Sequence, residues 1–488
     1  MLLSKLLTLI DYEACINFKE TEIIDVTDIS SEVGKGTVFV CIKGTRTFGE
    51  QFVSEASKRG CEVVVTSNKS ACEFDKTIII SKNARKTLAE ISKAIYFNFD
   101  INMKIVGITG TKGKTTTSEM IVRLLNSISV KTASFGTLGV KILEKIDPAF
   151  ESLNTTPSSR IIYKALRAAA LEGVEVAVIE VSSQALASYR VYGIPFDICI
   201  FTGLSEDHIG IHEHKNLDDY REAKRSLFRD YGAKTVIVNS LDPEAELMSL
   251  GVQRAIRVGK SDDDEYRISN IVFNESGIEF CLNSDMIRLG ILGEYNVINA
   301  ALAIATVSEM SEIDVSHFKD TLSKIEIPGR MEFWGWQKRS IIVDFAHNPQ
   351  SFEAVFLEAK RLAGNNIIAV FGSVGDRSFG RRSGLASVAE RYADISVITS
   401  DDTFEENAES VCEEIYGNFR DKSAVYTVLD RRMAIQKAFS LSNEGDFILI
   451  LGKGHEKHQI VGGVRYPFSD QEVIQSLGAI KRRIARCE

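Results

Sequence analysis

The sequence predicts an α/β fold in three domains, each built on a mostly parallel sheet covered by helices. A chain of 488 residues is too long for one hydrophobic core and corresponds to about three domains. Short runs rich in β-branched residues alternate with helical patterns along the chain, as in βαβ units. Polar and glycine-rich segments directly follow several of these runs, at the position where open α/β sheets bind their ligands.

These runs divide the chain into domains 1–101, 102–326 and 327–488. We expect a small N-terminal α/β domain, a central P-loop domain with a doubly wound sheet, and a Rossmann-like C-terminal domain. The break at Pro328-Gly329 marks the last boundary. Besides the strand before the P-loop, the expected strands begin at Gly36, Cys61, Thr77, Val174, Asp197, Thr235, Ser340, Asn366, Ile395 and Asp446.

The composition is that of an ordinary globular protein, with 44% hydrophobic and 26% charged residues. The net charge of −9 argues against general binding to nucleic acids or membrane surfaces, because these attract basic patches. We see no apolar run of membrane-spanning length, no secretory signal and, among the eight cysteines, no C-x-x-C pair. We therefore expect a cytoplasmic protein that neither binds nucleic acid nor inserts into a membrane, and we take it to be a monomer.

The stretch VGITGTKGKTTTSEM, from Val106 to Met120, is typical of a phosphate-binding loop. An apolar strand precedes it and a helical pattern follows it, which is the context such a loop requires. Gly110 and Gly113 let the backbone turn its N–H groups inward, at the positive end of the following helix. The general motif has glycine where this chain has Ile108, so the loop is a variant.

Two side chains of this loop suit a nucleotide. Lys114 can reach the β- and γ-phosphates, and Thr115 can bind magnesium. We therefore expect MgATP or another nucleotide here, the alternative being a glycine-rich turn with an incidental lysine. The similar stretch Gly452-Lys453-Gly454 lacks the following Ser or Thr, which favours a backbone turn or a substrate contact over a second nucleotide site.

Polar residues after other strands add candidate ligands. Glu180 ends an apolar run, which is the position of a magnesium-binding carboxylate in many nucleotide enzymes, although it could instead pair with a lysine. His208 lies in a histidine-rich segment that is either a surface loop or a source of cation ligands. The turn that contains Thr155 and Thr156 could cap a helix or bind a polar substrate.

Taken together, these motifs resemble those of the Mur ligase family, most closely its UDP-N-acetylmuramoyl-tripeptide synthetase branch. The resemblance covers essentially the whole chain. It rests, in order, on GTKGKTT from Gly110, NTTP from Asn154, EVSSQAL from Glu180, Asp207-His208, YREAK from Tyr220, GEYNVINA from Gly293, PGRME from Pro328, DFAHNP from Asp344 and GKGHE from Gly452.

The resemblance implies an ATP-dependent ligase that adds a diamino acid to the D-Glu of UDP-MurNAc-L-Ala-D-Glu in peptidoglycan precursor synthesis. The reaction would pass through an acyl phosphate and release ADP and phosphate. It also implies two magnesium ions and a carbamate, derived from CO2, on Lys224. This carbamate would turn a cationic side chain into an anionic metal ligand.

The resemblance also assigns roles to individual residues. Catalytic roles fall to Lys114, His208 and Lys224. The expected metal ligands are Thr115, Glu180, His208 and Lys224. The nucleotide would contact Gly110, Thr111, Gly113, Lys114, Thr115, Thr116, Asn296, Arg330 and Asp344. The UDP-linked substrate would contact Ser30, Thr155, Thr156, Ser182 and Arg190, and the amino acid would contact Asp401, Asp402, Gly452 and Glu456.

One departure from the family pattern bears on the amino acid. Relatives that add meso-diaminopimelate carry Asp-Asn-Pro-Arg where this chain has Asp401-Asp402-Thr403-Phe404. A phenyl ring cannot bind a distal carboxylate as arginine does, whereas two aspartates suit a distal ammonium. We therefore predict L-lysine, with meso-diaminopimelate as the alternative if Arg377, Arg381 or Arg382 compensates.

Two other functions remain open at this point. A folylpolyglutamate synthase-like ligase would use the central and C-terminal domains but leave the first hundred or so residues without a role. A nucleotide-dependent switch that is not an enzyme would keep the phosphate-binding loop and need neither Lys224 nor the arginines of the third domain.

Overall fold

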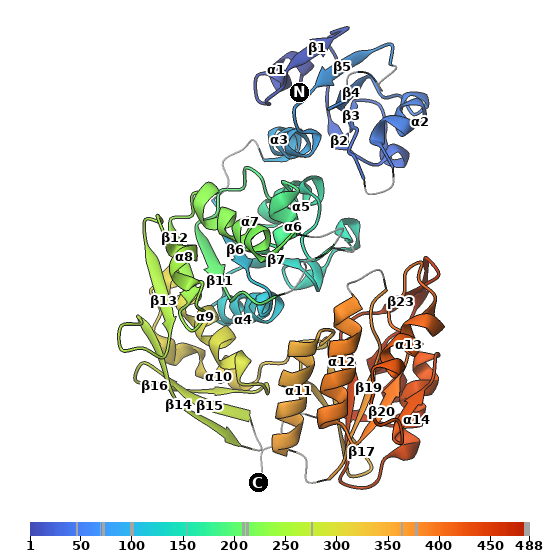
Figure 1. Cartoon of the computed structure of the whole chain (residues 1–488). Coiled ribbons are helices and arrows are strands. Elements are labelled where there is room, and N and C mark those ends of the chain that lie inside the picture. The colour runs from blue at the N-terminus through green and yellow to red at the C-terminus, as the bar shows by residue number, and fades with distance from the viewer. Residues whose placement is uncertain are drawn as a thin grey trace. The chain divides into compact units, whose positions relative to one another are not determined.

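The computed structural model shows two compact units, Met1–Tyr266 with Leu302–Glu312, and Arg267–Ala301 with Ile313–Glu488 (Figure 1). The structure describes residues 1–44, 47–68, 70, 74–97, 102–152, 154–206, 210, 214–274, 277–362, 365–375 and 379–482. No helix in these ranges is long and apolar enough to span a membrane.

The first unit begins with a five-stranded sheet in the order β1-β5-β4-β3-β2. Four strands are parallel and β1 is antiparallel to β5. Every residue of β3, β4 and β5 is buried, as expected for parallel strands covered on both faces. The strands are β1 Ala14–Ile16, β2 Asp25–Thr27, β3 Thr37–Val40, β4 Val63–Thr66 and β5 Thr77–Ile80, and the helices are α1 Leu3–Leu7, α2 Val53–Lys58 and α3 Ala84–Tyr96.

The second sheet of this unit runs β13-β12-β11-β6-β10-β7-β8-β9. Its first six strands are parallel, with β6 between β11 and β10, which confirms the doubly wound prediction. The antiparallel edge strands β8 and β9 were not predicted. The strands are β6 Lys104–Thr109, β7 Thr132–Gly136, β8 Gly139–Ile142, β9 Lys145–Ile146, β10 Val176–Glu180, β11 Ile198–Phe201, β12 Thr235–Asn239 and β13 Ala255–Gly259. The helices are α4 Lys114–Ser127, α5 Ser159–Leu171, α6 Ser183–Ala187, α7 Leu217–Asp230 and α8 Ala245–Ser249.

A cluster of charges joins the N-terminal sheet to α5. The Asp25 carboxylate lies 2.8 Å from Lys164 Nζ and 3.3 Å from Arg160 Nη2, and it accepts a hydrogen bond from the Tyr96 hydroxyl. Arg160 also pairs with Glu32. Burial raises the pKa of Asp25, but these donors together lower it by more than burial raises it. The net pKa therefore lies below the usual range. The carboxylate therefore stays charged and links β2 to α3 through Tyr96 and to α5 through Arg160 and Lys164.

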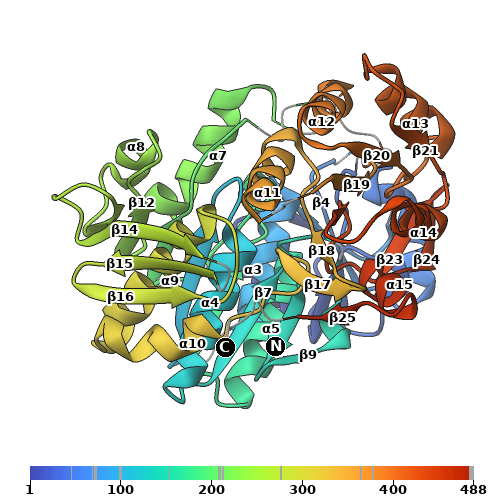
Figure 2. The same cartoon turned by 90° about the horizontal axis from the view of Figure 1, so that it is seen from below.

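The second unit starts with an antiparallel meander of β14, β15 and β16, visible side by side in Figure 2. Sequence analysis missed it, although Ile278, Phe280 and Leu282 alternate with less buried residues in β15. The elements are β14 Tyr266–Asn274, β15 Gly277–Leu282, β16 Asp285–Leu289, α9 Tyr295–Ser311, whose last turns belong to the first unit, and α10 Lys319–Ser323.

The C-terminal sheet has the order β21-β20-β19-β22-β18-β17-β25. Its first five strands are parallel, with α11 and α12 on one side and α14 on the other, as predicted for a Rossmann-like domain (Figure 1). The strands are β17 Glu332–Trp336, β18 Arg339–Asp344, β19 Ile367–Phe371, β20 Ile395–Ile398, β21 Val425–Thr427, β22 Phe447–Leu451 and β25 Ile480–Lys481, with a separate hairpin of β23 His458–Val461 and β24 Val464–Pro467. The helices are α11 Pro349–Leu362, α12 Phe379–Tyr392, α13 Ala408–Gly417, α14 Arg431–Leu441 and α15 Asp470–Ser476. The domain bounds 1–101, 102–326 and 327–488 stay predictions.

We expect Ile179→Ala to lower the free energy of unfolding by about 2–5 kcal/mol, measured by urea denaturation. Ile179 is fully buried in β10, between β6 and β7, so the shorter side chain leaves a cavity. Ile146→Ala is the matched control, because Ile146 is 63% exposed on β9 and its truncation should change stability by less than about 0.5 kcal/mol. Equal effects of the two changes would contradict the core assignment.

Candidate functional site

The predicted phosphate-binding loop connects β6 to α4. Gly110 has φ +154°, and a Cβ there would lie 2.0 Å from Thr202 Oγ1. Gly113, at φ +85°, is the N-cap residue of α4. Glycine is required at both positions, since one has no room for a side chain and the other adopts a left-handed conformation. The loop therefore places the N-terminus of α4 where it can attract an anion.

Two buried or partly buried ammonium groups converge on this loop. Lys114 Nζ donates to the carbonyl oxygens of Gly110, at 2.7 Å, and Thr111, at 3.0 Å. Lys224 Nζ, from α7, donates to the same Gly110 oxygen at 2.9 Å. Two positive charges beside a helix N-terminus form a strongly anion-attracting site, which suits a polyphosphate.

Glu180, at the end of β10, lies beside the loop and is 2% exposed. Its Oε2 accepts hydrogen bonds from Thr115 Oγ1 at 2.9 Å and Thr137 Oγ1 at 3.0 Å. Burial raises the pKa of Glu180, while Lys114 and the threonine donors oppose this shift. The close approach requires Gly136, where a Cβ would lie 2.0 Å from Glu180 Oε1. The hydroxyl and carboxylate oxygens of Thr115 and Glu180 are of the kind that Mg²⁺ prefers, so the predicted pair fits this ion.

Lys224 is held by contacts that the sequence did not reveal. It is 1% exposed, and its ammonium lies 4.3 Å from the centre of the Tyr220 ring, one turn earlier on α7. The Tyr220 hydroxyl donates to Thr111 Oγ1 at 3.0 Å, which links α7 to the phosphate-binding loop. As an ammonium, Lys224 cannot bind a metal ion. The other predicted ligand of a second ion, His208, lies outside the described residues.

The predicted substrate residues of the first unit come together around one threonine. Thr156 Oγ1 donates to the Glu180 carbonyl oxygen at 2.7 Å and accepts the Ser182 N–H at 2.9 Å. Arg190 Nη1 donates to the Thr156 carbonyl oxygen at 2.9 Å. The Thr155 hydroxyl is 3.4 Å from that of Thr137. These contacts join the turn that contains Thr155 and Thr156, called the substrate turn below, to Glu180 beside the phosphate-binding loop.

Ser30 lies in the N-terminal region, where its hydroxyl donates to Glu55 Oε2 at 2.7 Å. Its short helical turn also carries Glu32, the partner of Arg160 on α5. The contact of Arg160 was not predicted, because an arginine two residues after a helix N-cap gives no local sign of a partner more than a hundred positions earlier in the chain. The structure thus links the segment around Ser30 to the helix that follows Thr156.

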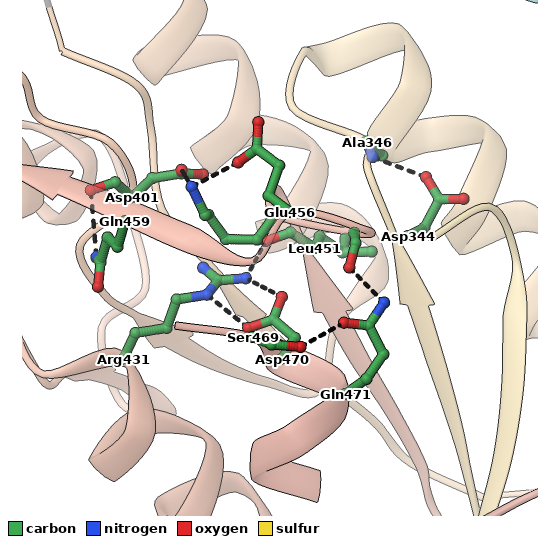
Figure 3. Close-up of polar contacts among 12 residues, drawn as sticks. Asp344, Ala346, Asp401, Arg431, Leu451, Glu456, Gln459, Ser469, Asp470 and Gln471 are labelled. Carbon is green, nitrogen blue, oxygen red and sulfur yellow. Dashed lines mark hydrogen bonds and ion pairs between the residues drawn. The ribbon is translucent and has the colours of Figure 1, made fainter. Parts of the chain in front are cut away.

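In the second unit, Asp344 at the end of β18 organises its own loop. Its Oδ2 accepts the Met331 N–H at 2.7 Å. Its Oδ1 accepts the Ala346 N–H, also at 2.7 Å (Figure 3). Burial raises the pKa of Asp344, and Arg330 partly offsets this shift. The Arg330 guanidinium lies 4.5 Å from the centre of the Phe345 ring. Asp344 and Arg330 are therefore neighbours, and their predicted contact with the nucleotide stays a prediction.

Asn296 is placed less favourably for its predicted contact with adenine. It is 1% exposed, and its amide donates to the Leu292 carbonyl oxygen at 2.5 Å. Its own oxygen accepts from Asn299 Nδ2 at 3.0 Å. Both ends of the amide thus serve the start of α9 in this structure, and the adenine contact stays a prediction.

A buried charge cluster surrounds the loop after β22 (Figure 3). Lys453, which is 0% exposed, places its Nζ 2.6 Å from Asp402 Oδ1, 2.5 Å from Glu456 Oε2 and 3.9 Å from Asp401 Oδ1. Burial raises the pKa of Glu456 to about 7, with Lys453 lowering it and the two aspartates raising it. The structure therefore brings the predicted residues Asp401, Asp402 and Glu456 together around one lysine.

This lysine weakens the physical argument for a lysine substrate. The two aspartates were expected to bind a distal ammonium, but the Lys453 ammonium already pairs with Asp402. From the sequence, Gly452-Lys453-Gly454 was expected to be a backbone turn or a substrate contact. Its ion pairs were missed, because Asp401 and Asp402 lie far earlier in the chain, and the nearby Glu456 was assigned to the amino acid. The preference for L-lysine stays a prediction.

Two of the arginines that could compensate for Phe404 are described. Arg382 is buried and pairs with Glu406 and Glu414, so its guanidinium is already engaged. Arg381 is also buried. The third, Arg377, lies outside the described residues.

The fold and the site define a class: an α/β protein whose phosphate-binding loop, lysines and buried carboxylate suit a nucleoside triphosphate. Models of three family domains match the chain in order. They are the "Mur ligase family, catalytic domain" at residues 26–102, the "Mur ligase middle domain" at 108–307 and the "Mur ligase, glutamate ligase domain" at 329–454.

Individual proteins agree with these matches. A UDP-N-acetylmuramoyl-L-alanyl-D-glutamate–2,6-diaminopimelate ligase from Aquifex aeolicus is 34% identical, over 93% of both chains. One of the same name from Clostridium perfringens is 32% identical, over 98% of this chain and 99% of its own. A solved structure of such a ligase aligns with a TM-score of 0.64 at 28% identity, over 93% of this chain and 94% of its own. The chain belongs to the Mur ligase family and is an ATP-dependent ligase, which confirms the resemblance seen in the sequence.

We expect Gly452→Ala to lower the melting temperature and to disrupt the charge cluster. The residue has φ +114°, and its added Cβ would lie 2.4 Å from Asp401 Oδ2. Gly462→Ala is the matched control, because Gly462 also has a positive φ, +57°, but nothing lies within 4 Å of a Cβ there. Thermal unfolding of both variants separates the clash from the backbone strain. An equal decrease in melting temperature in the two variants would show that the clash with Asp401 does not affect stability.

Proposed function

We propose that this ligase joins a diamino acid to the D-Glu carboxylate of UDP-MurNAc-L-Ala-D-Glu, in the synthesis of peptidoglycan precursors. The observation that carries the proposal is the convergence of Lys114 and Lys224 on the Gly110 carbonyl, beside the buried Glu180. This arrangement suits phosphoryl transfer, and the relatives that match the chain over nearly its full length are named for this reaction.

The chemistry requires an activated carboxylate. Because oxide is a poor leaving group, the γ-phosphoryl group of ATP first passes to the substrate carboxylate, forming an acyl phosphate and ADP. The incoming amine then attacks the acyl carbon, the tetrahedral intermediate collapses, and phosphate leaves with the former carboxylate oxygen. Negative charge builds up in both steps, and Lys114, the first residue of α4, would stabilise that charge.

Thr115 and Glu180 would hold the first of two magnesium ions, whose charge would offset that of the phosphates. His208 and Lys224 are the proposed ligands of the second. Lys224 would serve only as a carbamate, formed with CO2, because its ammonium repels a cation. The burial of Lys224 supports this role, since a carbamate is better protected from water there.

The remaining roles follow the loops in which the residues lie. Gly110, Thr111, Gly113 and Thr116 would bind phosphates, and Asn296, Arg330 and Asp344 would contact the rest of the nucleotide. Ser30, Thr155, Thr156, Ser182 and Arg190 would bind the UDP-linked dipeptide, and Asp401, Asp402, Gly452 and Glu456 the amino acid. We also propose that the enzyme acts in the cytoplasm as a monomer.

For the amino acid, we propose 2,6-diaminopimelate as the first candidate, because the relatives are named for it. L-lysine is the second candidate, on the ground of Asp401, Asp402 and the missing arginine at Phe404. The acids around Lys453 still outnumber the cation, so a diamino acid suits the cluster in either case.

The decisive assay is phosphate release from ATP with magnesium and UDP-MurNAc-L-Ala-D-Glu, comparing meso-diaminopimelate, L-lysine and L-ornithine. We expect turnover that requires both the dipeptide substrate and an amino acid. Turnover with L-lysine alone would reverse our choice of amino acid and leave the ligase intact. Phosphate release without the dipeptide would indicate a nucleotide-dependent switch, and turnover with a folate and glutamate would indicate the folylpolyglutamate synthase reaction.

We expect Lys224→Ala to reduce kcat/KM by about 100-fold or more, because the site loses an anionic metal ligand. Short carboxylates such as acetate should restore part of the activity by taking the place of the carbamate. Lys234→Ala is the control, since the Lys234 side chain is 77% exposed. Full activity of Lys224→Ala would rule out the carbamate role.

A further inference from the structure

A second buried ion pair lies beside the charge cluster and has no part in the function proposed so far. Arg431 opens α14 and is 1% exposed. Its Nε and Nη2 donate to the two carboxylate oxygens of Asp470, on α15, both at 2.8 Å (Figure 3). A two-pronged contact of this kind fixes the plane of the guanidinium. The pair therefore holds Arg431 in one orientation.

That orientation directs the arginine to the end of β22. Arg431 Nη2 also donates to the carbonyl oxygen of Leu451, the last residue of the strand, at 2.9 Å (Figure 3). The next residue, Gly452, starts the loop that carries Lys453 and Glu456. A Cβ on Gly452 would lie 3.9 Å from Arg431 Nη1 and 2.4 Å from Asp401 Oδ2. Only a glycine thus separates the guanidinium from the Asp401 carboxylate.

The two atoms that flank Gly452 have no hydrogen-bond partner among the described residues, namely Arg431 Nη1 and Asp401 Oδ2. Both side chains are buried, with exposures of 1% and 2%. Burial lowers the pKa of Arg431, but Asp470, Asp401 and Glu456 raise it above its usual range, so the guanidinium stays charged. Its charge offsets part of the acid excess that Lys453 leaves in the cluster.

We propose that Arg431 is a positioning residue for the amino-acid half of the reaction. It anchors the first residue of the turn Gly452–Glu456 through Leu451 and balances the charge of Asp401, so that Lys453 and Glu456 keep their places. Its side-chain hydrogen bonds go to Asp470 and Leu451, so its effect passes through the turn. The inference rests on the proposed function and adds a residue that determines how the amino acid binds.

The test is Arg431→Lys in the full-length enzyme. Lysine keeps the positive charge, but its single ammonium cannot make the bidentate contact with Asp470 and also donate to the Leu451 carbonyl oxygen. We expect KM for the amino acid to rise about tenfold, which corresponds to the loss of one hydrogen bond to a charged group. KM for ATP and KM for the dipeptide substrate should stay within about twofold of their wild-type values. Arg432→Lys, the exposed neighbour on α14, should change none of the three constants.

A second readout separates positioning from general damage. Hydroxylamine captures the acyl phosphate as a hydroxamate without any amino acid, so Arg431→Lys should form hydroxamate at the wild-type rate. If Arg431→Lys does not fold, Asp470→Asn replaces it, because this change keeps the guanidinium and weakens its anchor; the KM shift should be smaller and in the same direction.

The outcomes are distinct. An unchanged KM for the amino acid, or an equal loss in all three KM values and in hydroxamate formation, overturns the role of Arg431 alone. A wild-type enzyme that forms no hydroxamate from the dipeptide substrate overturns the proposed function, and the inference with it.

Discussion

The burial of one carboxylate, Glu180, is the constraint on which the rest of the first unit depends. A buried carboxylate is costly unless hydrogen-bond donors and positive charge surround it. Thr115 brings α4 to it, Thr137 brings the end of β7, and its own backbone carbonyl binds Thr156 of the substrate turn. The phosphate-binding loop and the turn that carries the proposed substrate residues are thus fixed by contacts to a single residue at the end of β10.

The second unit also buries carboxylates, and it surrounds them with several charged side chains. Asp401, Asp402 and Glu456 share Lys453, and the Arg431–Asp470 pair lies behind them. Such networks stabilise little by themselves, because desolvation consumes most of the Coulomb attraction, but each charge depends on its partners for its geometry. Glycine at position 452 allows the charged side chains to pack this closely, since any side chain there would displace Asp401. The cluster therefore packs three carboxylates around one ammonium in a small buried volume.

The two lysines at Gly110 and the one among the acids illustrate opposite uses of the same side chain. Lys114 donates to the Gly110 carbonyl oxygen and leaves positive charge for an anion, whereas Lys224, which meets the same oxygen, is proposed to carry an anionic carbamate. Lys453 is surrounded by carboxylates and leaves negative charge for a cation. An ATP-dependent ligase needs both a positive and a negative electrostatic environment, because one half of its reaction involves phosphates and the other half involves an amine.

The sequence by itself determined the fold class, the phosphate-binding loop and the family, because glycines, β-branched runs and short motifs act locally and keep their spacing in any context. Only the tertiary structure decided which charges are paired. Lys453 meets Asp402, Arg431 meets Asp470 and Tyr220 links Lys224 to Thr111 through contacts that no local pattern encodes. The meander of β14 to β16 was missed for another reason: β15 does alternate in its local pattern, but its antiparallel pairing with β14 and β16 is seen only in the structure. Long-range packing thus set the electrostatics around the residues that the sequence had proposed as a site.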